Sequence, residues 1–260
     1  MKYDIIIQGG QSNAEGFGGG DVIKEYIPNE RILYLTDNRS IEPTEQGLLV
    51  KPPENIDCPF FISVADNHLC GDTVRGDFSL TFAQEYLRDG LLADDRKLLI
   101  IRSAVGGTGF KKGHWGKYDY LYMRMLAMIE YVFSVAPNSR VVAFLWHQGE
   151  HDAFEGNPPE EYRKQLTGLI EGVRSRYGKM PFICGDFVNE WKQLNIEQCA
   201  PIVETIKNVS NDIGNSAFVE TKDLLSNNQM IGDGDNIHFC RQALQVLGRR
   251  YFEAFKNLKG

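Results

Sequence analysis

The sequence has few cysteines, and their spacing marks neither a metal site nor a disulfide framework. There are five, an odd number, and no two of them form a C-x-x-C pair. They are scattered along the chain as Cys58, Cys70, Cys184, Cys199 and Cys240. Such a set is typical of reduced thiols in a reducing compartment. We therefore expect free thiols and a cytoplasmic protein.

Long apolar runs and clustered basic residues are also missing. No apolar stretch approaches the roughly 18 residues that span a bilayer, and no secretory n-region precedes the first predicted strand. The net charge is −7, from 35 acidic against 28 basic residues, without a basic stripe. These features argue against membrane and nucleic-acid partners. With 42% hydrophobic residues, residues 1–260 are expected to form one domain with a substantial core.

The opening stretch of the chain combines a buried strand, a glycine turn and a serine. The β-branched run at residues 5–7 predicts a strand buried on both faces, which stops at two glycines, residues 9–10. Gln11, Ser12 and Asn13 follow directly. In an open parallel sheet, this turn is where ligands bind. The alternative is a surface loop whose Ser12 and Asn13 only cap the next helix.

Strands alternate with helices along the rest of the chain. Strands are predicted at residues 31–36, 97–103, 140–146, 181–187 and 216–221, and helices at 77–92, 118–136, 158–177, 199–213 and from 239. Asn157 is expected to cap the third of these helices, with Pro158 as its first residue. Residues 37–76 show no clear period and are predicted to be irregular. The alternation predicts a parallel sheet covered on both faces by helices.

Three strand ends carry turns that suit hydrolytic chemistry, at Ser12, Gly106 and Gln148. A nucleophilic serine needs a base, a group that orients the base, and donors for an oxyanion. His238, with Asp235 three residues before it, is the candidate base. The alternative for this pair is an aspartate that caps the last helix beside a half-exposed histidine. The Ser12 and Gly106 N–H groups and the Gln148 amide are candidate oxyanion donors, although Gln148 could instead be a structural amide.

Two other kinds of site are weighed against this one. The H-x-x-E-H pattern from His147 to His151 is typical of some zinc proteases. That chemistry needs both histidines on one helical face, whereas here the motif follows a strand and contains Gly149, so we expect no metal site. A nucleotide-binding module is disfavoured because no lysine follows the glycines of residues 9–20 before Lys24, and G-x-G-x-x-G is absent.

Four motifs together resemble a known enzyme superfamily. G-Q-S-N at residues 10–13, A-V-G-G-T at 104–108, W-H-Q-G-E at 146–150 and D-N-I-H at 235–238 occur in the order of the SGNH hydrolases. More narrowly, the chain resembles the sialate O-acetylesterase and acetylxylan-esterase-like branch, in which glutamine replaces the usual asparagine. The resemblance implies a three-layer α/β/α sandwich with a flavodoxin-like parallel sheet, and no cofactor.

The resemblance also implies a role for each motif residue. Ser12 would be the nucleophile, His238 the base and Asp235 its partner, while Ser12, Gly106 and Gln148 would form the oxyanion hole. Supporting roles are expected for the remaining motif residues, with Glu150 fixing the loop of Gln148; these residues are Gln11, Asn13, Gly107 and Glu150. Ala14-Glu15-Gly16 departs from the family pattern in a loop expected to line the pocket.

The sequence therefore predicts a serine esterase that removes short acyl groups from carbohydrate hydroxyls, with acetyl as the expected group. Its partner would be a small-molecule or oligosaccharide acetyl ester. The same residues could transfer the acyl group to another acceptor or act on a non-carbohydrate ester, and these alternatives stay open. His114 and Trp115 could contact a sugar, but core packing is the stronger expectation for the tryptophan.

Overall fold

The computed structural model describes residues 1–52, 59–70 and 73–259, and this part of the chain contains a seven-stranded sheet. Its order is β11-β10-β9-β1-β8-β2-β5. The strand bounds are β1 (Tyr3–Gly10), β2 (Ile32–Asp37), β5 (Phe60–Val64), β8 (Lys97–Arg102), β9 (Arg140–His147), β10 (Phe182–Gly185) and β11 (Ser216–Val219). All neighbouring pairs are parallel except β2 and β5.

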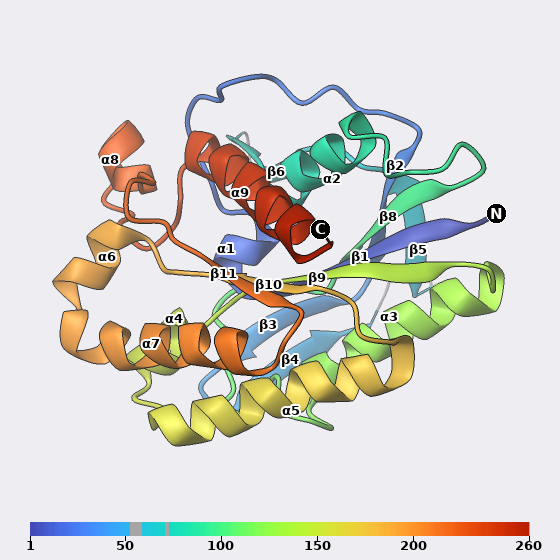
Figure 1. Ribbon diagram of the computed structural model, residues 1–260. Coiled ribbons are helices and arrows are strands. Elements are labelled where there is room, and N and C mark those ends of the chain that lie inside the picture. Colours follow the sequence, from blue (N-terminus) through green and yellow to red (C-terminus); the bar gives the residue numbers. More distant parts are fainter. Residues whose placement is uncertain (53–58, 71–72, 260) are drawn as a thin grey trace.

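Helices cover both faces of this sheet (Figure 1). The helices α2 (Phe78–Arg88) and α9 (Arg241–Lys259) pack together on one face. On the other face lie α3 (Tyr120–Val135), α5 (Pro159–Tyr177) and α7 (Ile196–Asp212). The apolar sides of these helices bury the sheet between them, as their three- and four-residue periodicity predicts. The predicted α/β class, with a mostly parallel sheet between two helical layers, is confirmed.

Strand β1 forms the centre of the sheet. It lies between β8 and β9, and Ile5, Ile6 and Ile7 are all fully buried. Gly10, at its carboxyl end, has φ +128°, and a Cβ there would lie 2.0 Å from the His147 carbonyl oxygen. Only glycine fits so close to the neighbouring strand. The chain therefore leaves the sheet here, and Gln11 N–H donates to the His147 carbonyl at 3.0 Å.

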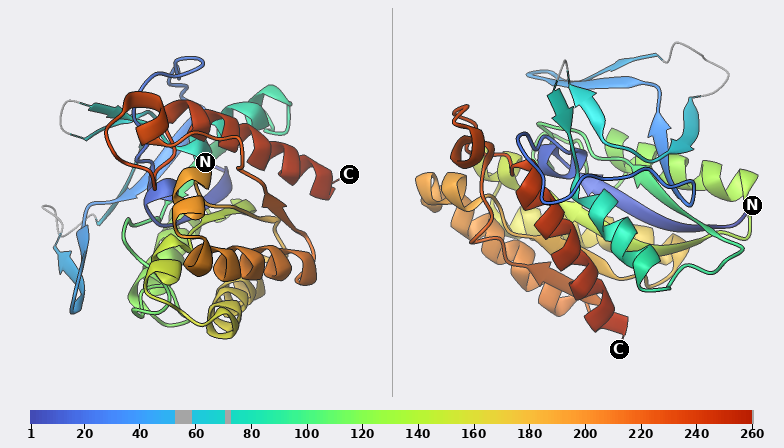
Figure 2. Two further views of the ribbon diagram at one scale, coloured as in Figure 1. Left: turned by 90° about the vertical axis from the view of Figure 1, so that its left-hand side faces the viewer. Right: turned by 90° about the horizontal axis from the view of Figure 1, so that it is seen from above.

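The prediction that residues 37–76 are irregular is wrong for much of the segment. It contains two hairpins and the edge strand β5; the hairpin strands are β3 (Ser40–Thr44), β4 (Gly47–Lys51), β6 (His68–Cys70) and β7 (Thr73–Arg75). Figure 2 shows these strands extending beyond the helical layers on one side of the molecule. They are short, β3 is mostly exposed and β4 is mostly half-buried, so neither a continuous apolar run nor a clean alternation reveals them.

Several short helices and helix ends also differ from the prediction. Four helices of four to six residues are too short to show a period, namely α1 (Ser12–Glu15), α4 (Glu150–Phe154), α6 (Asn189–Leu194) and α8 (Asn227–Ile231). Helix α5 begins one residue later than expected, with Pro159 first and Pro158 as its N-cap. Asn157 does not cap it, because its side-chain amide donates to Asp152 and Gln165 instead.

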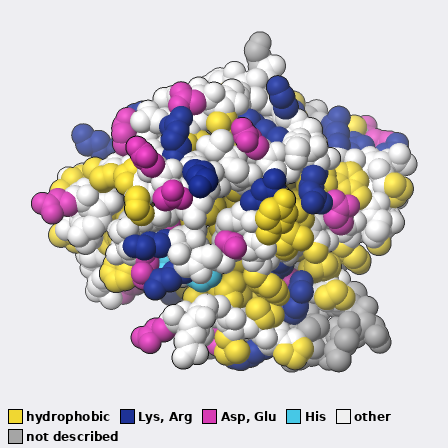
Figure 3. All heavy atoms as spheres, turned by 90° about the horizontal axis from the view of Figure 1, so that it is seen from below, with side chains coloured by type: hydrophobic (Ala, Val, Ile, Leu, Met, Phe, Trp, Pro, Cys, Tyr) yellow, Lys and Arg dark blue, Asp and Glu magenta, His cyan; other side chains and the backbone are white. Residues whose placement is uncertain are grey.

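The structure tests part of what the sequence predicts for the cysteines, for membrane-spanning helices and for surface charge. Cys184, Cys199 and Cys240 are free thiols, and all three are buried. Cys58 lies outside the described residues, as does the side chain of Cys70. Among the helices of the described chain, none is both long and apolar enough to cross a membrane. On the face shown in Figure 3, basic and acidic side chains are interspersed.

Candidate active site

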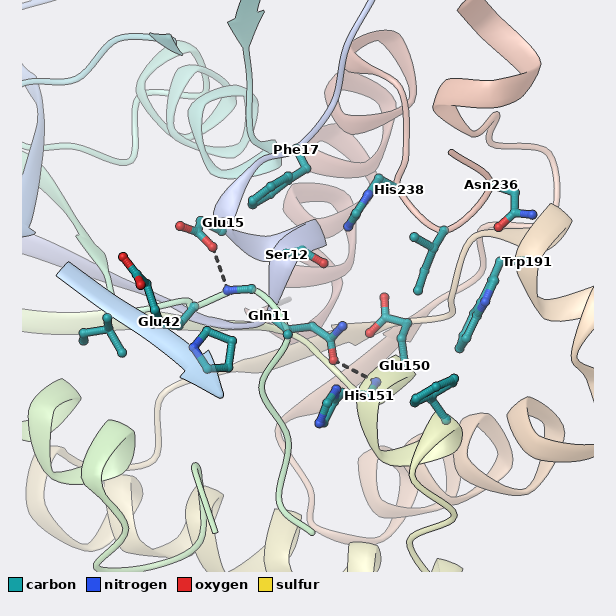
Figure 4. Close-up of a pocket in the computed structure, with 17 residues that line it drawn as sticks. Gln11, Ser12, Glu15, Phe17, Glu42, Glu150, His151, Trp191, Asn236 and His238 are labelled. Atoms are coloured by element: carbon teal, nitrogen blue, oxygen red, sulfur yellow. Dashed lines mark hydrogen bonds between the residues drawn. The ribbon is translucent and has the colours of Figure 1, made fainter. Parts of the chain in front are cut away.

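A cavity of about 650 Å³ opens at the carboxyl edge of the sheet, where β1, β8 and β9 end. Its lining includes Ser12, Gly106 and His238, which come from three distant parts of the chain. Of the predicted supporting residues, Gln11, Gly107 and Glu150 also line the cavity. Figure 4 shows Ser12 and His238 next to each other, both facing this space.

Ser12 is the first residue of α1, directly after the turn that ends β1. The residue is 6% exposed, and within the described chain neither its N–H nor its hydroxyl makes a hydrogen bond. A Cβ placed on Gly106 would lie 3.5 Å from the Cβ of Ser12, so the two turns are in direct contact. The serine hydroxyl is therefore available to a ligand in the cavity, beside the backbone of Gly106.

His238 is oriented by a carboxylate behind its ring. Its Nδ1 lies 2.8 Å from Oδ2 of Asp235, which also accepts a hydrogen bond of 2.9 Å from the Asn227 amide. Burial tends to raise the pKa of Asp235, but the bonds from His238 and Asn227 outweigh it and lower the pKa to about 2. Phe17 stacks on the imidazole at 5.2 Å. With Nδ1 engaged, Nε2 is the nitrogen left for the cavity.

Asn13 joins the serine turn to the histidine loop. Its side-chain oxygen accepts from the N–H of Phe239 at 3.0 Å, and its amide donates to the carbonyl of Ile237 at 3.0 Å. These two backbone groups flank His238 in the chain. The same amide donates to Glu150 at 2.8 Å. Asn13, the residue after Ser12, thus holds both sides of the His238 loop in place across more than 220 residues of sequence.

The Gly106 N–H lies at the predicted position beside Ser12, but a side chain already occupies it. The Glu15 carboxylate accepts from it at 2.7 Å, and both residues line the cavity (Figure 4). Burial raises the pKa of Glu15, opposed by the Gly106 N–H and by the nearby Arg102 and Arg124. The sequence departure at Glu15 therefore lies directly in the site.

The structure does not bring the Gln148 amide to the cavity. Its Nε2 donates to Asp152 at 2.7 Å, and its Oε1 accepts from Tyr162 at 3.2 Å. Of the two glutamines, Gln11 is the one that lines the cavity, together with Asn236. The Gln11 amide oxygen accepts from Gln148 at 3.3 Å and from the His151 N–H at 3.1 Å, which leaves its NH₂ group for the cavity.

Glu150 is fully buried and joins the turn after β9, which includes Gln148, to Asn13. Its Oε1 accepts the Asn13 bond, and its Oε2 has no partner among the described residues. Burial raises the pKa of Glu150, and burial lowers the pKa of the neighbouring His147 to about 3. Glu150 Oε2 is thus a buried oxygen without a partner among the described residues, in a side chain at the cavity wall.

The two histidines of the H-x-x-E-H pattern do not share a helical face. His147 ends β9, and its Nδ1 lies 3.1 Å from the Tyr251 hydroxyl, whereas His151 belongs to α4. The zinc-protease geometry is therefore not formed by this motif. Within residues 1–52, 59–70 and 73–259, no group of three or more His, Cys, Asp or Glu side chains is arranged to hold a metal ion.

The residues expected in the second glycine loop pack into the interior. Trp115 is fully buried, and its indole N–H donates to Thr108 at 2.9 Å, so the core-packing expectation holds. His114 is 2% exposed and accepts from the Gly109 N–H, which keeps it away from a sugar. Sequence reasoning gave no role to Phe17 or Asn227. Phe17 stacks on the His238 ring and the Asn227 N–H donates to the His238 carbonyl, and both contacts join distant or irregular segments. The one local sequence signal is the capping box at Ser226, which begins the helix of Asn227.

A family model described as "Carbohydrate esterase, sialic acid-specific acetylesterase" matches residues 2–257. The chain belongs to this family. It is a carboxylic ester hydrolase, as the sequence motifs predict. No curated protein sequence matches the chain.

Solved structures share the fold of this esterase at low sequence identity. NanS superposes with a TM-score of 0.75 at 18% identity and covers 99% of this chain and 98% of its own. A protein from Arabidopsis thaliana gives 0.70 at 20% identity, with 98% of both chains covered. A carbohydrate esterase family 2 enzyme from Corynascus thermopiles (Myceliophthora fergusii) gives 0.54 at 10% identity, covering 100% of this chain and 67% of its own.

Proposed function

We propose that this esterase removes acetyl groups from carbohydrate hydroxyls through Ser12, His238 and Asp235. The main support is that Ser12 and His238 face one cavity while the Asp235 carboxylate lies 2.8 Å behind the imidazole. This is the arrangement of nucleophile, base and orienting group that acyl transfer needs. The cavity also offers apolar side chains, Trp191 and Phe154, as surfaces for a sugar ring.

The first half of the reaction uses three groups in sequence. The Ser12 hydroxyl oxygen attacks the acetyl carbonyl carbon while His238 Nε2 takes the hydroxyl proton. Asp235 holds Nδ1–H and stabilises the imidazolium that forms. When the tetrahedral intermediate collapses, the imidazolium returns the proton to the leaving sugar oxygen, and the acetyl group stays on Ser12.

The second half releases the acetyl group to water. His238 removes a proton from a water molecule, the resulting hydroxide attacks the acyl carbon, and Ser12 leaves with the proton from His238. Acetate is the product. For the oxyanion in both halves we assign the N–H of Ser12 and the amide of Gln11, with Gly106 N–H added once Glu15 releases it. Gln148 then acts by holding the Gln11 amide oxygen.

Labelling with a fluorophosphonate tests this proposal directly. Mass spectrometry should find the label on the peptide that contains Ser12, with loss of hydrolysis of acetylated sugars. Ser12→Ala should lower kcat by on the order of 10⁴-fold or more, because the three residues act as a unit. Circular dichroism checks that the variant is folded. Turnover near that of the wild type in a folded Ser12→Ala would exclude Ser12 as the nucleophile.

A further inference from the structure

The cavity contains, beside Ser12, a carboxyl group that neither gives nor takes a proton in the proposed reaction. Glu15 is the last residue of α1, and its carboxylate accepts from Gly106 N–H at 2.7 Å, beside the Cβ of Ser12. An ester carbonyl that approaches Ser12 must come next to this carboxylate. Any charge carried by the substrate near its ester bond is therefore brought close to Glu15.

The charges that face Glu15 differ on its two sides. On the substrate side, the charged lining of the described chain is acidic, with Glu15, Glu42 and Glu150, and includes no lysine or arginine. Two histidines, His151 and His238, complete the titratable lining. Glu42 is exposed and is paired with Lys51 at 2.6 Å, so its charge is partly balanced. Glu15 is buried more deeply than Glu42, and burial raises the pKa of Glu15, while the Gly106 N–H and the nearby arginines favour its ionised form. When Glu15 is ionised, as the test at pH 8 favours, its charge is less screened by water than that of Glu42.

Three arginines, Arg39, Arg102 and Arg124, line a second cavity of about 270 Å³ that shares Glu15 as a wall. Arg102 donates to the Glu15 carbonyl at 2.8 Å and stacks on Tyr34. Arg124 pairs with Asp37 at 2.7 Å and donates to the Ser103 carbonyl. Neither arginine lines the cavity that contains Ser12. Arg102 thus holds the backbone of Glu15 and Arg124 is paired with Asp37, and neither is part of the wall that a ligand beside Ser12 would contact.

We propose that Glu15 is a specificity-determining residue that selects neutral acetyl esters and rejects esters with a carboxylate near the scissile bond. The inference rests on the proposed function, since it assumes attack by Ser12. It also departs from the description of the family, because sialic acid is itself an acidic sugar. Two like charges roughly 6 Å apart repel enough to change kcat/KM by about threefold in water and by about 100-fold at the effective dielectric constant of a protein surface, so for this partly buried site we expect about tenfold.

A pair of matched substrates tests the inference. 3-Acetoxybenzamide and 3-acetoxybenzoate have the same shape and acetyl group and differ in charge, and acetate release is measured at pH 8 for both. Each rate is divided by the rate of hydroxide hydrolysis of the same ester. The wild type should favour the benzamide by about tenfold or more in kcat/KM. In Glu15→Gln, whose amide oxygen can still accept from Gly106 N–H, the preference should fall to about threefold or less.

Control measurements separate the effect of the Glu15 charge from any loss of folded protein. The ratio of the two kcat/KM values from one preparation does not depend on the folded fraction, so it stays readable if Glu15→Gln or Glu15→Ala is less stable. Glu45→Gln, in the exposed turn of the β3–β4 hairpin, should leave the ratio unchanged. A wild type that shows no preference or favours the benzoate overturns the inference, and so does a ratio unchanged in Glu15→Gln. Hydrolysis of both esters by Ser12→Ala would instead refute the proposed function.

Discussion

Two pairs of polar residues near the carboxyl edge of the sheet, Asp235–His238 and Gln148–Asp152, each join a carboxylate to a polar side chain a few residues away. The pairs differ in whether that polar side chain faces the cavity. In Asp235–His238 the carboxylate holds a ring whose free nitrogen is left for the cavity, while in Gln148–Asp152 the carboxylate draws the amide away from it. Both contacts are local, spanning three and four residues. Spacing alone therefore does not tell whether a side chain faces a ligand.

The difference comes from the burial of each carboxylate. Asp235 accepts from the Asn227 amide and from the N–H groups of Ile237 and His238, and it remains partly exposed in the loop before α9. Asp152 is fully buried and accepts from the backbone of Phe110 and Lys111 as well as from Asn157. Each carboxylate thus has three further donors, and the two differ in where they lie. Asp152 is fully buried, so the amide that binds it is held in the interior, whereas Asp235 lies in a partly exposed loop, so the ring that it orients can face the cavity.

The largest loss of activity is expected from removing the bond between Asp235 and His238. Asp235→Asn should lower kcat by roughly 10³–10⁴-fold, because the amide no longer stabilises the imidazolium or fixes its tautomer. Steady-state kinetics on an acetylated sugar measures this. Asp233→Asn, two residues away in the same loop, should stay within about threefold of the wild type. A larger loss in Asp233→Asn than in Asp235→Asn would show that the wrong carboxylate was assigned.

A comparison of two glutamines tests what the Gln148–Asp152 pair does. Gln11→Ala should lower kcat by about 10²-fold, since the amide that faces the cavity is a proposed oxyanion donor. Gln148→Ala should lower kcat by less than about tenfold and lower the free energy of unfolding by about 1–3 kcal/mol, because buried partners lose their bonds. Kinetics and urea denaturation of both variants give the two quantities. If Gln148→Ala shows the larger loss of kcat in a stable protein, Gln148 itself is the donor.

A smaller effect is expected in the pH dependence of stability. The pKa of Asp235 is lowered to about 2 in the folded protein, below its ordinary value near 3.9. The ionised group therefore stabilises the fold above pH 4, and this contribution is lost as the pH falls through 2. Wild type and Asp235→Asn should differ most in denaturant midpoint at neutral pH and converge in acid. A difference that is constant with pH would contradict the bond from His238.

Much of the fold can be predicted from local sequence patterns. The run at Ile5–Ile7, the glycine turn after it and the periodic helices suffice for the layers and for the edge where the site forms. The strand pairs of residues 37–76 could not be predicted, since their strands are only three to five residues long and depend on pairing with one another. The short helices α4 and α8 likewise depend on their tertiary surroundings.

The sequence by itself determined that Ser12 would stand at the end of β1 and that Asp235 could reach His238, because the first depends on a glycine turn and the second on three residues of chain. Only the tertiary structure decided that Asn13 binds both sides of the His238 loop, that Gln11 and not Gln148 lines the cavity, and that Glu15 covers Gly106. The physical reason is that the direction of a long polar side chain depends on which donors and acceptors surround it, and those come from segments far apart in the chain.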